Sequence, residues 1–136
     1  MNKILIDSGP MIALFSSNDK YHTASVTFLK NNRQPLITTI ASITETLHLL
    51  DFNRGAQVDF LAWVAAGAVE IEPISAQDLL RIKELTIKYT DLPIDFADAC
   101  LVLLGEKLDI NTVATIDRDF DIYRLPGNKP FTVYVK

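Results

Sequence analysis

The chain has 136 residues, of which 49% are hydrophobic, and its formal net charge at neutral pH is -4. This length predicts one domain, residues 1–136, that buries enough surface to form a core. The negative charge argues against a protein that holds nucleic acid through a broad basic surface, because that mode of binding needs many lysines and arginines. It does not exclude a nuclease, since metal ions can turn a group of carboxylates into a phosphate-attracting site.

Cysteine content and hydropathy predict a cellular compartment. The single cysteine, Cys100, cannot form an internal disulfide and suits a reducing environment. Asp7, Gly9 and Pro10 interrupt the N-terminal apolar segment before a signal-peptide core could form. No stretch of the sequence is long and apolar enough to span a bilayer. We therefore expect a cytoplasmic protein without a membrane partner, and the high apolar content predicts a surface covered by a partner, such as a homodimer.

Short β-branched runs alternate with longer helical segments along the chain, which is typical of an α/β fold. The pattern predicts a three-layer α/β/α sandwich around a mostly parallel central sheet. Strands are predicted at residues 3–7, 35–39, 68–74, 111–117 and 131–135. Helices are predicted from residue 8 onward and over residues 19–31, 42–50, 56–67, 75–89 and 91–107, with a short helical turn at 118–123.

The predicted helix over 91–107, DLPIDFADACLVLLGEK, is apolar almost all the way round, yet it carries Asp95 and Asp98 in its N-terminal part. An ionised carboxylate in a protein interior loses several kcal/mol of solvation unless something replaces the water. An arginine or lysine, the positive end of the helix dipole, or a bound cation could do so. No lysine or arginine lies within three positions of Asp98.

Four acids are predicted to meet at one edge of the sheet. Asp7 and Asp117 end two predicted strands, and Glu45 follows a third by about one turn of helix. Asp98 enters from the same side if its helix leads into the Asp117 strand by a right-handed crossover. Asp95, three residues before Asp98 on the same helical face, is a fifth candidate, although helix capping would also explain it.

Each acid alone has an ordinary explanation: Asp7 could start a turn, and Glu45 could face solvent. Four acids at one end of one sheet are harder to explain this way, because close carboxylates repel and one would be protonated unless a cation lay between them. Oxygen ligands without histidine or cysteine select hard ions. The pattern therefore predicts a Mg²⁺ or Mn²⁺ site made by Asp7, Glu45, Asp98 and Asp117.

Four segments together resemble the PIN-domain family, and within it the VapC-type toxins of toxin-antitoxin pairs. They are ILIDSGPMIALF with Asp7, ITTIASITETLHLL with Glu45, LPIDFADACLVLLGEK with Asp98 and TVATIDRDFDIY with Asp117. The resemblance spans nearly the whole length and implies a single PIN-like domain over 1–136. It also implies a Mg²⁺- or Mn²⁺-dependent endoribonuclease that uses these four acids as its catalytic centre, with RNA as substrate and a cognate antitoxin protein as partner.

Three further side chains are candidates for supporting contacts to the acids: Ser8, Asp95 and Thr115. Thr115 lies two residues before Asp117, and so on the same face of its strand. The sequence departs from the family in having Ser-Gly-Pro after the first acid, where Thr or Ser followed by an apolar residue is commoner. This departure leaves the local geometry around Ser8 open.

Other protein classes explain the acids less well. A haloacid-dehalogenase-type phosphatase needs a second aspartate two residues after the first, where this chain has Gly9. A phosphoacceptor receiver domain needs a pair of acids ahead of Asp7 and a lysine at the end of a late strand, and the sequence offers no convincing version of either. The main alternative to the nuclease is a catalytically silent PIN-like module for binding or scaffolding, which metal-dependent cleavage of RNA would distinguish.

Overall fold

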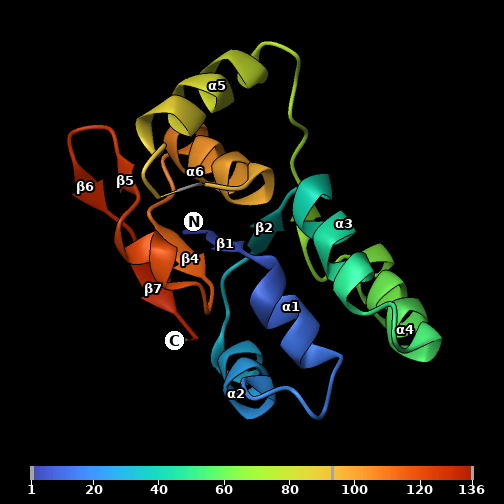
Figure 1. The fold of residues 1–136 in the computed structure, drawn as a ribbon. Coiled ribbons are helices and arrows are strands. Elements are labelled where there is room, and N and C mark those ends of the chain that lie inside the picture. Colours follow the sequence, from blue (N-terminus) through green and yellow to red (C-terminus); the bar gives the residue numbers. More distant parts are fainter. Residues whose placement is uncertain (1, 93, 136) are drawn as a thin grey trace.

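The computed structural model describes residues 2–92 and 94–135. At its centre is a parallel sheet whose strands have the spatial order β3 (Glu70–Ile71), β2 (Leu36–Thr38), β1 (Ile4–Ile6), β4 (Thr112–Ala114) and β7 (Thr132–Tyr134). The helices are α1 (Ser8–Leu14), α2 (His22–Asn31), α3 (Ile40–Leu49), α4 (Arg54–Ala65), α5 (Asp78–Lys88) and α6 (Phe96–Leu108). Figure 1 shows α5 and α6 on one side of the sheet and α1 and α2 on the other. The predicted three-layer α/β/α sandwich is confirmed.

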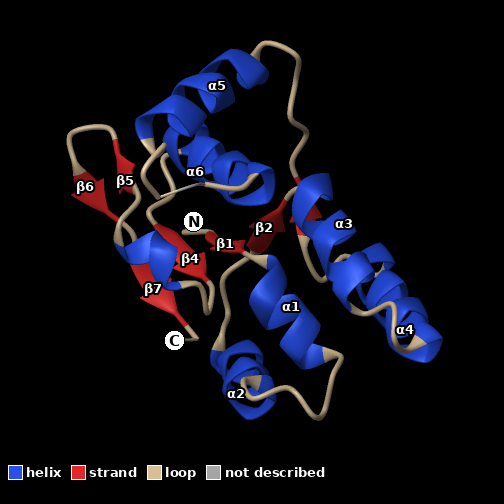
Figure 2. Cartoon of the chain, viewed as in Figure 1, coloured by secondary structure: helices blue, strands red, loops and turns tan. Residues whose placement is uncertain are grey.

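Each face of the sheet has its own apolar core, because successive side chains of a strand point to opposite faces. Leu5 belongs to the core that the sheet forms with α5 and α6. Its neighbours Ile4 and Ile6 belong to the core formed with α1, α3 and α4. A strand buried on both faces must be apolar at every position, which explains why β1 reads as a continuous apolar run. Figure 2 shows this layering, with red strands between blue helices.

The predicted helix boundaries differ from the structure mainly at the helix starts. Helix α6 begins at Phe96 rather than at residue 91, because Asp95 caps its first turn. The Asp95 carboxylate accepts the backbone N–H of Asp98 at 2.7 Å and so satisfies a donor that the helix leaves open. The starts of α2, α3, α4 and α5 lie two or three residues from their predicted positions.

A small hairpin was not predicted. Strands β5 (Arg124–Leu125) and β6 (Lys129–Pro130) pair antiparallel outside the main sheet. Their turn contains Gly127 and Asn128, which both have positive φ and suit a tight connection. Two-residue strands show too little alternation of apolar and polar residues to be recognised in a sequence. Leu125 is buried in the core below α6, so the hairpin closes that core at one end.

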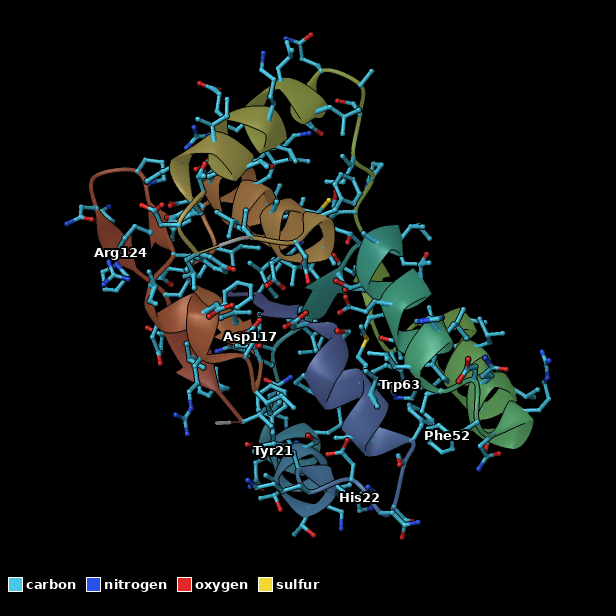
Figure 3. All side chains as sticks on the ribbon, viewed as in Figure 1. Tyr21, His22, Phe52, Trp63, Asp117 and Arg124 are labelled. Carbon is cyan, nitrogen blue, oxygen red and sulfur yellow. The ribbon has the colours of Figure 1, made fainter. Side chains whose placement is uncertain are left out.

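Several large apolar side chains are exposed, as the apolar composition led us to expect. Phe52 and Val58 are 68% and 57% exposed, and Leu61 of α4 is 48% exposed. Figure 3 shows Phe52 at the end of the α3 and α4 pair, away from the sheet. Among the described residues these side chains are left exposed, and they give an apolar surface to α4 and the turn before it. In the ranges that the structure describes, none of the helices has both the length and the apolar character needed to cross a membrane.

Candidate active site

Three aspartates meet where β1 and β4 end, and we call them the acid triad. Asp7 follows β1 directly, Asp117 lies three residues beyond β4, and Asp98 lies in the first turn of α6. Each offers one carboxylate oxygen, and these oxygens all lie within 4.8 Å of one another. Figure 3 shows Asp117 beside α1, next to the short helical turn that follows it in the chain. Of the four acids predicted to converge, the structure brings these three into one cluster.

Asp7 is fixed by two hydrogen bonds from different elements. It caps α1, where its Oδ1 accepts the backbone N–H of Ser8 at 2.8 Å. Its Oδ2 accepts the hydroxyl hydrogen of Thr115, also at 2.8 Å. The Thr115 oxygen in turn accepts the backbone N–H of Asp117 at 3.0 Å. This one buried hydroxyl therefore couples two acids of the triad across neighbouring strands.

Glu45 lies at the edge of the triad and not within it. It lines the same cleft from α3, and its carboxylate accepts a hydrogen bond from the hydroxyl of Ser8. It does not belong to the group of acids whose oxygens lie within 4.8 Å of one another. Ser8, which is itself buried, thus holds the fourth predicted acid at the rim of the cleft.

The Ser-Gly-Pro segment fits the site because it permits a close approach of two chain segments. A Cβ atom at Gly9 would lie 2.6 Å from Cγ1 of Ile116, which is too close for a real contact. Glycine therefore lets α1 pack against the segment that carries Thr115 and Asp117. Pro10 occupies the first turn of α1, where a proline costs no hydrogen bond. With this segment in place, Asp7 lies within the acid triad.

Asp95 takes the capping role that the sequence had left open beside a role in the site. It is the residue that caps α6, just before the first turn of the helix. Its backbone is extended, with φ -78° and ψ 168°. Its side chain still lines the cleft beside the triad. Sequence alone cannot separate the two arrangements, because capping and a shared helical face both call for an acid at a helix start.

Tyr123 is a contact of the triad that the sequence analysis missed. Its hydroxyl donates a hydrogen bond to Oδ2 of Asp98 at 3.4 Å. The ring is fully buried, beyond the short helical turn η1 (Arg118–Asp121). The hydroxyl of a buried tyrosine usually finds a hydrogen-bond partner. The sequence gives no indication of which partner, because Asp98 is 25 residues away.

Asp7 and Asp98 are buried, which opposes their ionisation. Burial raises the pKa of Asp7 to about 6. Burial also raises the pKa of Asp98 to about 10, and the charges of Asp7, Asp95 and Asp117 contribute to the rise. Within the described ranges, the ion pairs of 4.0 Å or less include no lysine or arginine bound to a triad acid. A cation among these oxygens would reverse the effect and favour the ionised forms.

The triad lies in a cleft that continues into an apolar groove. The cleft has a volume of about 270 Å³, and Asp19, which was not predicted as a site residue, also lines it. The groove has a volume of about 870 Å³ and shares Glu45 and Asp95 with the cleft. Ile40 of α3 and Phe96 of α6 line the groove and are more than half exposed. The acids thus stand at one end of a larger apolar surface.

Residues 4–125 of the chain match the PIN domain family. The chain belongs to the PIN-domain family. The matched range includes every element that contributes to the acid triad, from β1 to the turn after β4. The resemblance inferred from the four sequence segments is confirmed at the level of this family.

Known relatives of this PIN domain are VapC proteins. Ribonuclease VapC26 of Mycobacterium tuberculosis is 27% identical over 133 residues, which cover 96% of this chain and 98% of that protein. The fold is similar to that of VapC20 of Mycobacterium tuberculosis, a sarcin-ricin loop cleaving toxin, with a TM-score of 0.80 and 21% identity over 88% of this chain and 93% of that one. It is also similar to VapBC2 from Rickettsia felis bound to a DNA fragment from their promoter, with a TM-score of 0.65 and 13% identity over 97% and 98%.

Proposed function

We propose that this PIN domain is a metal-dependent endoribonuclease that hydrolyses phosphodiester bonds in RNA, and that it is the toxin of a toxin-antitoxin pair. The observation that carries the proposal is the acid triad, in which three carboxylate oxygens lie within 4.8 Å of one another. Buried acids this close together need a cation to remain ionised. The relationship to Ribonuclease VapC26 over nearly the whole chain supports RNA as the substrate class.

The donor set of the triad fits Mg²⁺ or Mn²⁺. It contains carboxylate oxygens and no sulfur or nitrogen, which is the ligand choice of hard divalent ions. Asp7, Asp98 and Asp117 would hold the ion, and Glu45 would complete the site from the rim. When bound, the ion lowers the pKa of a water molecule and stabilises charge on the phosphate and the leaving oxygen.

The chain's own residues orient the acids and shape the cleft. Thr115 fixes Asp7 and the backbone of Asp117, and Ser8 fixes Glu45. The N-terminal end of α6 lies at the triad, where the positive end of its dipole favours an anionic phosphate. Apolar side chains that line the cleft limit the access of bulk water, namely Ile12, Leu49 and Ile116.

The apolar surfaces support protein partners. A cognate antitoxin that lies in the groove would cover Ile40 and Phe96 and reach the acids through the shared wall at Glu45. The similar fold of VapBC2 from Rickettsia felis, a structure that contains both proteins of such a pair, supports this partner class. The exposed apolar surface on α4 offers an interface for a homodimer. An RNA-cleaving toxin of this kind would act in the cytoplasm. We also propose that residues 1–136 form one domain.

Cleavage of a fluorescent single-stranded RNA by the purified protein tests the proposal. We expect cleavage with Mg²⁺ or Mn²⁺, none with EDTA, and recovery when the metal is restored in excess. Residues that only contact a metal ligand typically contribute about 10- to 100-fold to metal affinity or activity. Asp98 is proposed as a ligand itself, so Asp98→Asn should lower the cleavage rate by about 100-fold or more. Glu84→Gln is the control, since Glu84 is an exposed acid on α5.

The catalytically silent alternative predicts another result in the same assay. A binding or scaffolding module would be stabilised by metal without cleaving RNA under any metal condition. Wild-type protein that is folded and metal-bound but inactive on a range of RNAs would therefore overturn the nuclease proposal.

A further inference from the structure

Tyr123 is held rigidly by packing, so its hydroxyl has a defined direction. Its ring centroid lies 5.0 Å from that of Tyr89 and 5.1 Å from that of Phe120, in edge-to-face arrangements. Its backbone N–H donates to the carbonyl of Asp119 at 3.1 Å. The hydroxyl reaches Oδ2 of Asp98 at 3.4 Å. A fully buried ring fixed on several sides cannot turn this hydroxyl away without disturbing the core.

Every acid of the triad accepts a hydrogen bond from a donor outside the triad. Asp7 accepts from the hydroxyl of Thr115, and Asp117 accepts from the backbone N–H of Asp119 at 2.9 Å. Asp98 accepts from the hydroxyl of Tyr123. A carboxylate can rotate about its Cβ–Cγ bond, and a donor fixed on one oxygen limits that rotation. Such outer contacts orient metal ligands and raise metal affinity.

We infer that Tyr123 is a positioning residue of the metal site, whose hydroxyl holds Oδ2 of Asp98 and thereby sets the orientation of that carboxylate toward the ion. The inference rests on the proposed function, because it takes the triad as the place where the metal binds. It does not depend on the RNA that is cleaved. Tyr123 touches neither the ion nor the RNA and acts only through Asp98.

Tyr89 provides a matched control within the same aromatic cluster. It is also buried, and its ring packs against that of Tyr123. Its hydroxyl oxygen accepts the backbone N–H of Arg124 at 2.9 Å, and within the described residues no hydrogen bond joins this hydroxyl to an acid of the triad. Tyr89→Phe and Tyr123→Phe therefore each remove one buried hydroxyl from the same cluster, but only the second removes a contact to the triad.

The test is the affinity for Mn²⁺, measured by calorimetry and by the rise in melting temperature with metal, for the wild type and both variants. We expect about tenfold weaker binding for Tyr123→Phe and unchanged binding for Tyr89→Phe. RNA cleavage by Tyr123→Phe should need more metal and approach the wild-type kcat at saturating metal. Wild-type metal affinity in Tyr123→Phe, or an equal loss in Tyr89→Phe, would overturn the inference.

Failure of the proposed function has a different signature. If the wild type binds Mn²⁺ but cleaves no RNA, the nuclease proposal fails while the metal affinities of the two variants still decide the role of Tyr123. If the wild type binds no Mn²⁺, both the nuclease proposal and this inference fail.

A second measurement uses the wild-type chain and does not require Tyr123→Phe to fold. The chain has four tyrosines, and 3-fluorotyrosine would give each a ¹⁹F resonance. Replacing Tyr21, Tyr89 and Tyr134 by phenylalanine one at a time assigns three resonances, and the fourth belongs to Tyr123. We expect the Tyr123 resonance to shift when Mg²⁺ is added. A Tyr123 resonance that does not move at saturating metal would overturn the inference.

Discussion

Acidic side chains at the two ends of helix α6 have opposite charged surroundings. Near its C-terminal end, Glu106 accepts two hydrogen bonds from Arg81 at 2.9 and 2.7 Å, and Lys107 pairs with Asp78 at 3.3 Å. Near its N-terminal end, the buried Asp98 has other acids as its charged neighbours. The paired acids need nothing beyond the chain, whereas the unpaired ones call for a cation.

The pKa values of the two ends record this difference. The hydrogen bond from Arg81 to Glu106 raises the pKa of the Arg81 guanidinium, so the charged form is favoured at the C-terminal end. Burial raises the pKa of Asp98 to about 10, so the charged form is disfavoured at the N-terminal end. One end of the helix is therefore complete as a structure, and the other is where we propose that a cation binds.

The largest expected effect comes from neutralising one acid at each end. In metal-free protein, Asp98→Asn should raise the free energy of unfolding by about 2–4 kcal/mol, because it removes a buried acid that resists ionisation. Glu106→Gln should lower the free energy by about 1 kcal/mol, because it weakens a partly exposed ion pair. Urea denaturation in EDTA measures both changes. If Asp98→Asn unfolds the protein, the two ends of α6 do not differ as described.

The pH dependence of stability should differ with and without metal. Asp7 and Asp98 have raised folded-state pKa values, of about 6 and about 10, against an ordinary value of 3.8. Below about pH 4 they are protonated in both states, and as the pH rises the unfolded chain loses its protons first. Metal-free stability should therefore fall with rising pH, by about 1 kcal/mol per unit between roughly pH 6 and pH 9.

Saturating Mg²⁺ should flatten this dependence, because the ion replaces the protons on the triad. Urea denaturation across this pH range, with EDTA or with Mg²⁺, is the measurement. The Asp98→Asn variant serves as the control, since it lacks the acid expected to cause most of the slope. A metal-free stability that rises with pH would contradict the burial of these acids.

A smaller effect is expected from the hydroxyl that couples Asp7 to Asp117. Thr115→Val keeps the side-chain shape but removes the hydrogen bond to Asp7, and should cost about 1–2 kcal/mol of stability. RNA cleavage should fall by about tenfold, because Asp7 loses its orientation. Thr112→Val is the matched control, since the Thr112 hydroxyl donates to the carbonyl of Lys3 at 2.8 Å, near the other end of β4. Equal losses of cleavage in both variants would show that Thr115 has no special role.

The sequence predicts the layers of the fold and the place where the acids meet because both follow from short-range rules. A continuous apolar strand has to be buried on both faces, and an acid directly after it has to lie at the carboxyl edge of a parallel sheet. Asp7 and Asp117 follow this logic. All strands of a parallel sheet end at the same edge, so both acids lie at that edge whatever the order of the strands.

The features that the sequence did not predict depend on side-chain contacts between distant residues. Glu45 stands apart from the triad because the Ser8 hydroxyl holds it, and nothing in the spacing of these two residues indicates that contact. Tyr123 reaches Asp98 only because a turn and a short hairpin pack around its ring. The cap made by Asp95 was one of two roles that the sequence left open, because an acid that caps a helix and an acid within its first turn have the same sequence signature.

Gly9 has a consequence for the genetics of such a protein. Alanine at this position would have to displace Ile116, which stands between Thr115 and Asp117 in the chain. Every glycine codon becomes an alanine codon through one nucleotide substitution. Ordinary mutation can therefore introduce the alanine side chain that crowds Ile116. A gene could therefore carry all four acids intact and still encode a weakened protein. Surveys that judge activity from the acids alone would miss such an allele.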